Sequence, residues 1–149
     1  MIGEKIMPNI ILVSGGFDPI HSGHIKLIND ANKYGDVVVL LNSDEWLRNK
    51  KGKEFLHFDE RKIIMKNIKG VIDVIDFDDT DKTCVDGIKK AKLLYKNNVI
   101  KFANGGDRND HSTPEKEFCD KNNIETLFSI GGNNKSNSSS WILKKWKEQ

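Results

Sequence analysis

The chain has 149 residues, of which 37% are hydrophobic, so we expect one hydrophobic core and a single domain over residues 1–149. Its 24 Lys and Arg against 22 Asp and Glu leave a net charge of +2, which argues against nucleic acid as a general partner. An apolar run of the ~18 residues needed for a membrane span is absent from the sequence, as is a signal-peptide pattern at its start. The two cysteines, Cys84 and Cys119, are widely spaced, which favours a reducing, cytoplasmic location over a disulfide framework or a zinc site.

Short apolar strands and amphipathic helices alternate along the chain. Apolar runs bounded by turn residues predict the strands, and apolar residues at helical spacing predict the helices. The predicted strands are Ile10–Val13, Val37–Leu41, Val71–Phe77, Val99–Ala103 and Glu125–Ile130. The predicted helices are Ser22–Tyr34, Phe58–Lys69, Thr83–Lys96, one that begins at Thr113-Pro114, and Ser138–Trp146. This order predicts an α/β fold with a Rossmann-like five-stranded parallel sheet and helices on both faces.

The loop after the first predicted strand carries the densest group of candidate site residues. Gly15 and Gly16 let the backbone approach a ligand, and the next helix begins near Ser22, where unpaired N–H groups and the helix dipole favour an anion. His21 and His24 are three residues apart across the first helical turn, so both rings can point the same way. Ligands of parallel sheets bind beyond the carboxyl ends of the strands. We therefore interpret the loop as a polyphosphate site rather than as a glycine turn with two surface histidines.

The segment Phe17–His24 resembles the signature of the cytidylyltransferase-like nucleotidyltransferases, a His-x-Gly-His preceded by Phe-Asp. Further segments follow in the order of that family, and the resemblance covers about Ile10 to Leu143. These segments are Asn42–Asp44, Lys50–Lys53, Glu60-Arg61, Phe77–Thr80, Asn104–Arg108 and Ser138–Ser140. The chain length and the run His24–Ile28 resemble glycerol-3-phosphate cytidylyltransferase. The Asn-Ser-Asp, Phe-Asp-Asp-Thr and Gly-Gly-Asp segments resemble the adenylyltransferase domain that acts on heptose 1-phosphate.

The resemblance implies a role for each matching residue. His21 and His24 would contact the triphosphate and stabilise the transition state, with Asp18 at the reacting phosphates. Lys50 or Lys53, together with Arg61, would hold phosphates of the nucleotide or the acceptor. The other nucleotide-binding candidates are Gly15, Gly16, Phe17, Gly105, Gly106, Asp107, Arg108, Ser138 and Ser139.

Each of these roles has a simpler alternative. The lysines would then form a solvated loop, and Arg61 would pair with an acidic neighbour on its own helix face. Asp107 would belong to a plain turn. Ser138 would serve only as an N-cap, although a capped helix start also binds phosphate.

The resemblance implies transfer of a nucleoside monophosphate to a phosphorylated small molecule, such as glycerol 3-phosphate or a sugar phosphate, with release of pyrophosphate. Mg²⁺ is expected with the nucleotide, with protein ligands unknown, and the family makes a homodimer an expectation. Chain length and the first motif favour CTP, because the sequence itself shows no residue pattern that separates cytosine from adenine. An ATP-dependent enzyme of the heptose 1-phosphate type and a non-catalytic nucleotide-binding module stay open as alternatives. Length and charge disfavour a fragment of an aminoacyl-tRNA synthetase.

Overall fold

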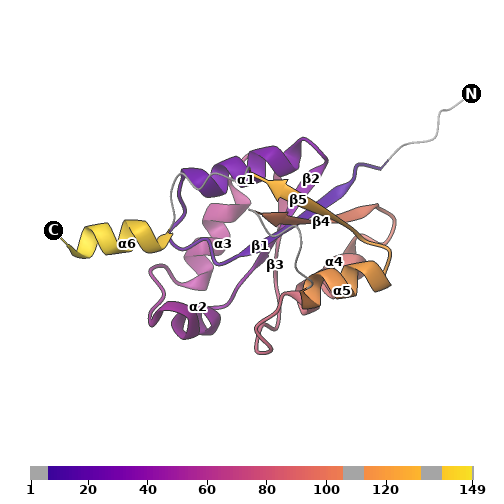
Figure 1. Cartoon of the computed structure of the whole chain (residues 1–149). Coiled ribbons are helices and arrows are strands. Elements are labelled where there is room, and N and C mark those ends of the chain that lie inside the picture. The colour runs from indigo at the N-terminus through magenta and orange to yellow at the C-terminus, as the bar shows by residue number, and fades with distance from the viewer. Residues whose placement is uncertain (1–6, 106–112, 132–138, 149) are drawn as a thin grey trace, which may run out of the picture.

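The computed structural model describes residues 7–105, 113–131 and 139–148 (Figure 1). Within these ranges, strands and helices alternate along the chain. The strands are β1 (Ile10–Gly15), β2 (Asp36–Leu41), β3 (Val71–Asp76), β4 (Ile100–Gly105) and β5 (Glu125–Ile130). The helices are α1 (Ser22–Asn32), α2 (Asp44–Lys51), α3 (Phe58–Lys66), α4 (Val85–Leu94), α5 (Pro114–Lys121) and α6 (Ser139–Lys147).

The strands form one parallel sheet in the order β3-β2-β1-β4-β5. The predicted Rossmann-like α/β fold is therefore confirmed. The chain builds outward from β1 to β2 and β3, then crosses back to β4 on the other side of β1. Open α/β sheets bind ligands where the strand order reverses in this way, beyond the carboxyl ends of the strands. The fold thus directs attention to the loop that joins β1 to α1.

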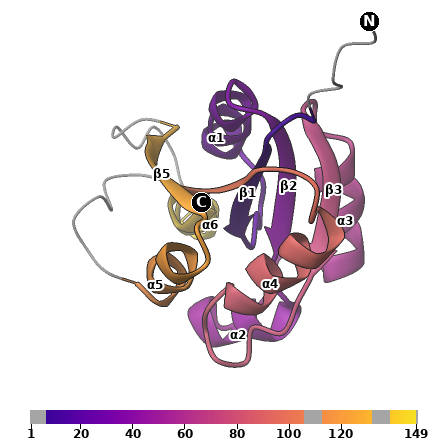
Figure 2. The same cartoon turned by 90° about the vertical axis from the view of Figure 1, so that its right-hand side faces the viewer.

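An apolar layer packs on each face of the sheet, because successive strand residues point to opposite faces. Ile11 and Val13 of β1 face a layer that includes Ile28 of α1 and Met65 of α3. Ile10 and Leu12 face the opposite layer, which is built with residues of α4 and α5. Figure 2 shows α4 and α5 side by side on their face, with α1 on the other side of the sheet. Both faces of the central strands are buried, as a parallel sheet requires.

Helix α2 was not predicted, since the sequence analysis assigned no helix or strand between Leu41 and Phe58. Its start is nevertheless well formed, because the Ser43 side chain accepts a hydrogen bond from the amide of Trp46, which is an N-cap. Gly52, at a φ of 91°, ends the helix, and this left-handed conformation favours glycine. Leu47 is the buried residue of α2, so most of the helix carries charged and polar side chains.

Other helix ends also differ from the prediction. Helices α1, α3 and α4 end before Tyr34, Lys69 and Lys96, where apolar spacing had extended them. Helix α6 extends away from the sheet (Figure 1), and its start is held by a 2.8 Å hydrogen bond from Ser139 Oγ to the Pro19 carbonyl. Within the described ranges, every helix is too short or too polar to cross a membrane.

Candidate functional site

His21 and His24 together cap the start of α1. His21 is the N-cap residue, and its Nδ1 accepts a 3.0 Å hydrogen bond from the Gly23 amide. In return, His24 Nδ1 accepts a 3.2 Å hydrogen bond from the His21 amide, which completes a capping box with imidazoles in place of the usual hydroxyl and carboxylate. The rings stack with centroids 3.8 Å apart, and Phe17 packs edge-on against His24 at 4.9 Å. We call His21 and His24 the histidine pair.

These caps fix which ring nitrogen carries the proton. A neutral imidazole has one N–H donor and one acceptor nitrogen. Because both Nδ1 atoms accept backbone N–H groups, each neutral ring has its proton on Nε2. Burial, followed by the nearby charges of His21 and Lys50, lowers the pKa of His24 from 6.5 to about 4. At neutral pH, His24 therefore presents an uncharged N–H donor beside the start of a helix, where anions bind.

The glycines and Phe17 pack this loop closely against α2. A Cβ atom added at Gly16 would lie 2.6 Å from Leu47 Cδ2 and 3.6 Å from Trp46 Cζ3. Only a hydrogen fits there, so Gly16 brings the loop into contact with α2. Phe17 adopts a φ of 50° and is 5% exposed, and such a backbone conformation is rare for an aromatic residue.

Asp18 joins the loop to the segment between α2 and α3. Its carboxylate accepts hydrogen bonds from the amides of Phe55, at 2.6 Å, and Leu56, at 2.7 Å. Lys51 Nζ lies 3.0 Å from the same carboxylate, whose side chain is 0% exposed, and also donates to the Asp18 carbonyl. The sequence analysis placed Asp18 at the reacting phosphates, where Mg²⁺ is expected with the nucleotide. Its oxygens are instead occupied and buried, so Asp18 does not fit as a magnesium ligand in this structure.

Arg61 is also buried rather than facing a phosphate. Its guanidinium donates to the carbonyls of Leu56 (2.9 Å), Gly16 (3.0 Å) and Asn42 (2.8 Å), and to Asp44 Oδ1 at 2.7 Å. Its side chain is 0% exposed. Both sequence interpretations, a phosphate ligand and a surface ion pair, require exposure that Arg61 lacks. The four acceptors come from three segments, around Gly16, Asn42–Asp44 and Leu56, so the residue holds these loops together.

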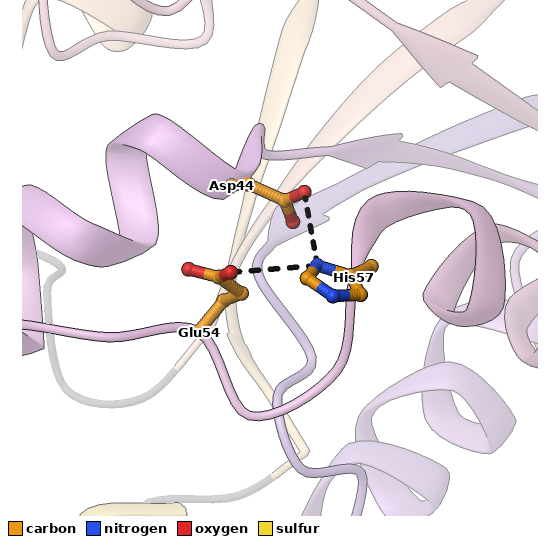
Figure 3. A group of neighbouring side chains, drawn as sticks. All are labelled: Asp44, Glu54 and His57. Carbon is orange, nitrogen blue, oxygen red and sulfur yellow. Dashed lines mark ion pairs between the residues drawn. The ribbon is translucent and has the colours of Figure 1, made fainter.

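A cluster of Asp44, Glu54 and His57 lies beside Arg61 and could hold a metal ion by residue type (Figure 3). His57 Nδ1 is 3.4 Å from Glu54 and 3.8 Å from Asp44. Each carboxylate already has a guanidinium partner, because Arg48 binds Glu54 through two hydrogen bonds of 2.7 and 3.1 Å and Arg61 binds Asp44. The Arg48 contact lowers the pKa of Glu54 to about 2. Two carboxylates and two guanidiniums balance in charge without a cation, which favours a structural ion-pair network.

A hollow of about 360 Å³ lies between α2 and the loop after β3. Its walls include Trp46 and Lys50 of α2 and Thr80 and Lys82 of the opposite loop. The Lys50 ammonium lies 4.8 Å from the centre of the Trp46 ring, a cation–π contact. Lys50 also contributes to the lowered pKa of His24, and the Trp46 ring lies 3.6 Å from where a Cβ atom at Gly16 would be. The hollow therefore adjoins the histidine pair.

The remaining predicted site residues lie on separate elements or outside the described residues. Lys53 is exposed just beyond the end of α2, and Gly105 ends β4. Ser139 lies at the start of α6 and is bonded to the motif loop. Gly106, Asp107, Arg108 and Ser138 lie outside the described residues.

The sequence analysis missed three residues that shape the site, namely Lys51, Trp46 and Asp79. Lys51 was passed over in favour of its neighbours, although it is the lysine that pairs with Asp18. The pattern of Ser43, two acidic residues and a later Gly52 was a signal for α2, and that helix would have placed Trp46 and Lys51. Asp79 accepts hydrogen bonds from the side chains of Asn42 and Ser43; both sides of this contact lie in segments that carry the resemblance, but their pairing is not visible in the sequence.

Comparisons of the sequence with curated proteins find two kinds of relative. The bifunctional protein HldE of Geobacter metallireducens is 29% identical over 148 residues, which cover 94% of this chain and 28% of that protein. The chain thus spans less than a third of the length of this relative. Glycerol-3-phosphate cytidylyltransferase of Bacillus subtilis is 38% identical over 66 residues, or 44% of this chain and 51% of that enzyme.

Solved structures give the same fold. The lipopolysaccharide core biosynthesis protein of Thermoplasma volcanium superposes with a TM-score of 0.65 at 20% identity, covering 88% of this chain and 100% of that one. The profile of the cytidylyltransferase-like family matches residues 12–137, which include the histidine pair, most of β1 and the other four strands. The chain therefore belongs to the cytidylyltransferase-like family of nucleotidyltransferases.

Proposed function

We propose that this chain transfers a nucleoside monophosphate from a nucleoside triphosphate to a phosphorylated small molecule and releases pyrophosphate. The observation that carries the proposal is the histidine pair, in which both Nδ1 atoms accept backbone amides, so that each neutral ring carries its proton on Nε2 at the start of α1. This start lies at the carboxyl end of β1, beside the strand-order reversal. Donors and an exposed helix start at that position suit a polyphosphate.

The reaction depends on how the two phosphate-bearing substrates are positioned, and it needs no general base. An acceptor phosphate monoester is largely dianionic at neutral pH, since its second pKa is about 6. One of its oxygens attacks the α-phosphorus in line, a new P–O–P linkage forms, and the bond to the β-phosphate oxygen breaks to release pyrophosphate. Uncharged His24 cannot contribute a full charge, so it acts as a hydrogen-bond donor to the charge that develops on the phosphoryl oxygens. Lys50 supplies positive charge nearby.

Magnesium would then enter with the triphosphate, because the Asp18 carboxylate is already occupied. Mg²⁺ commonly uses few protein ligands and several phosphate oxygens. Arg61, in turn, would act on the phosphates only through the loops that it holds.

The choice of nucleotide lies between CTP and ATP. The match to a cytidylyltransferase is higher in identity but covers 44% of the chain, whereas the match to HldE is lower in identity but covers 94%. We favour CTP from the first motif, with ATP as the alternative. Pyrophosphate release, measured for CTP and ATP against a panel of phosphorylated acceptors, tests this choice directly.

The role of the histidine pair is tested by His24→Ala. Loss of one donor to developing charge should lower kcat by about 10²–10³-fold, while circular dichroism shows an intact fold. His57→Ala is the matched control, because its ring is 76% exposed and lies in the ion-pair network instead of the pair. If His24→Ala keeps near wild-type turnover, the role assigned to His24 is wrong. If the wild-type protein binds triphosphate but releases no pyrophosphate with any acceptor, the chain is a binding module.

A further inference from the structure

The hollow beside the histidine pair has the position expected of an acceptor site. Trp46, in one wall, has its ring 3.6 Å from the position that a Cβ atom at Gly16 of the motif loop would take. Lys50, in the same wall, is close enough to His24 to lower its pKa. A molecule in the hollow would therefore border the place where the histidine pair receives the triphosphate.

The charged groups of the hollow differ in how far they are exposed. Lys50 and Lys82 contribute two ammonium groups, and Glu45 and Asp79 are the carboxylates of the wall. Asp79 is 7% exposed, and its oxygens accept hydrogen bonds from the Ser43 amide and hydroxyl and from Asn42. Lys50, Lys82 and Glu45 are exposed, so the exposed charges of the wall are two ammonium groups and one carboxylate.

The Trp46 ring in the wall already has the Lys50 ammonium against it. A tryptophan face beside acidic groups would suit an ammonium or quaternary ammonium ligand. Here, the Lys50 ammonium lies 4.8 Å from the centre of the Trp46 ring. A second cation would have to displace Lys50 from that ring or tolerate repulsion from it.

The wall opposite α2 is held in place before any ligand arrives. Asp78 accepts hydrogen bonds from both the amide and the hydroxyl of Thr80, at 2.9 and 2.7 Å. The Lys82 amide donates to the Asp79 carbonyl, and Lys82 has a φ of 69°. This conformation is uncommon for a lysine, and the surrounding turn sets the direction in which its side chain leaves the backbone.

We infer that this hollow receives the phosphorylated acceptor, and that Lys82 and the Lys50–Trp46 contact select an acceptor whose organic part is neutral or anionic over one that carries an amine. The inference rests on the proposed function. Asn49 and Thr80, which also line the hollow, supply hydrogen-bonding groups that suit hydroxyls. Polyol and sugar phosphates thus fit the hollow, whereas phosphoethanolamine and phosphocholine bring a positive charge toward two lysines.

A charge reversal at Lys82 tests the inference. Pyrophosphate release is measured for wild type and Lys82→Glu with glycerol 3-phosphate, glucose 1-phosphate, phosphoethanolamine and phosphocholine. We expect wild type to prefer the hydroxyl-bearing acceptors in kcat/KM by about tenfold or more, and Lys82→Glu to reduce this preference by about tenfold. Lys96→Glu makes the same change of charge at an exposed position just before β4, at the opposite end of the sheet, and should leave the preference unchanged.

Binding measurements separate the failure of this inference from the failure of the proposed function. Isothermal titration calorimetry follows the same four acceptors in the presence of a non-hydrolysable triphosphate. Turnover that favours the amines, or a preference that Lys82→Glu does not move, overturns the inference and leaves the transferase proposal intact. Absence of turnover with every acceptor overturns the transferase proposal. Calorimetry then still decides the inference, which fails if the hydroxyl-bearing phosphates do not bind or if the amines bind as tightly.

Discussion

The lowered pKa of His24 predicts that acid will destabilise the fold through this one residue. In the folded chain, His24 resists protonation down to about pH 4, whereas an unfolded histidine takes up its proton near 6.5. Protonation would also place a hydrogen on Nδ1, which now accepts the His21 amide. The stability that the neutral ring provides is therefore fully present above pH 6.5, and it declines as the pH falls from 6.5 toward 4.

The size of this effect follows from the shift. At pH 5, the unfolded ring is almost fully protonated and the folded ring mostly neutral, which corresponds to about 2 kcal/mol relative to pH 7. His24 keeps partial contact with water, since it is not fully buried. We therefore expect a loss of about 1–2 kcal/mol in the free energy of unfolding between pH 7 and pH 5.

Urea unfolding of wild type and His24→Asn at both pH values isolates this contribution. Asparagine keeps an acceptor near the position of Nδ1, so the cap on the His21 amide survives, but it does not titrate. The wild-type protein should lose about 1–2 kcal/mol more than the variant, because other groups titrate in both. His57→Asn should lose as much as wild type. An equal loss in wild type and His24→Asn would refute the reasoning.

Two further predictions concern the buried polar contacts around the motif loop. Arg61→Met should lower the free energy of unfolding in urea by about 3 kcal/mol, because Asp44 and three carbonyls lose their buried donor. A loss below about 1 kcal/mol would contradict the view that Arg61 holds these loops together. Asp18→Asn should cost about 2 kcal/mol and speed hydrogen exchange at the amides of Phe55 and Leu56, which donate to the carboxylate; unchanged exchange would show that these bonds are not formed in solution.

The sheet was predictable because its signals are local. Apolar runs such as Ile10–Val13 and Val37–Leu41 are buried on both faces, so they stand out without any knowledge of their neighbours. Helix α2 was missed for the opposite reason. It buries Leu47 alone and carries charge on its other sides, so no apolar stripe marked it, and only its cap and its terminal glycine could have done so.

The placement of the histidine pair was predictable, but the contacts of the charged residues around it were not. His21 and His24 lie where a strand, a turn and a helix start follow each other, and a short stretch of sequence contains all three. Arg61 and Asp18 were expected at phosphates because the family resemblance implied it. Their actual partners, such as the Gly16 carbonyl and the Phe55 amide, are backbone groups distant in sequence. Side-chain type alone does not reveal such partners.

The four acceptors on Arg61 bear on how this fold can be re-engineered. Segments around Gly16, Asn42 and Leu56 share one guanidinium, so a loop grafted at any one of them must reproduce its carbonyl position or disturb the others. The 78–83 loop lies outside that junction and is tied to the rest of the site through the Asp79 carboxylate. On the proposed acceptor role of the hollow, a library that keeps Asp79 and varies its neighbours should therefore diversify acceptor choice without disturbing the histidine pair.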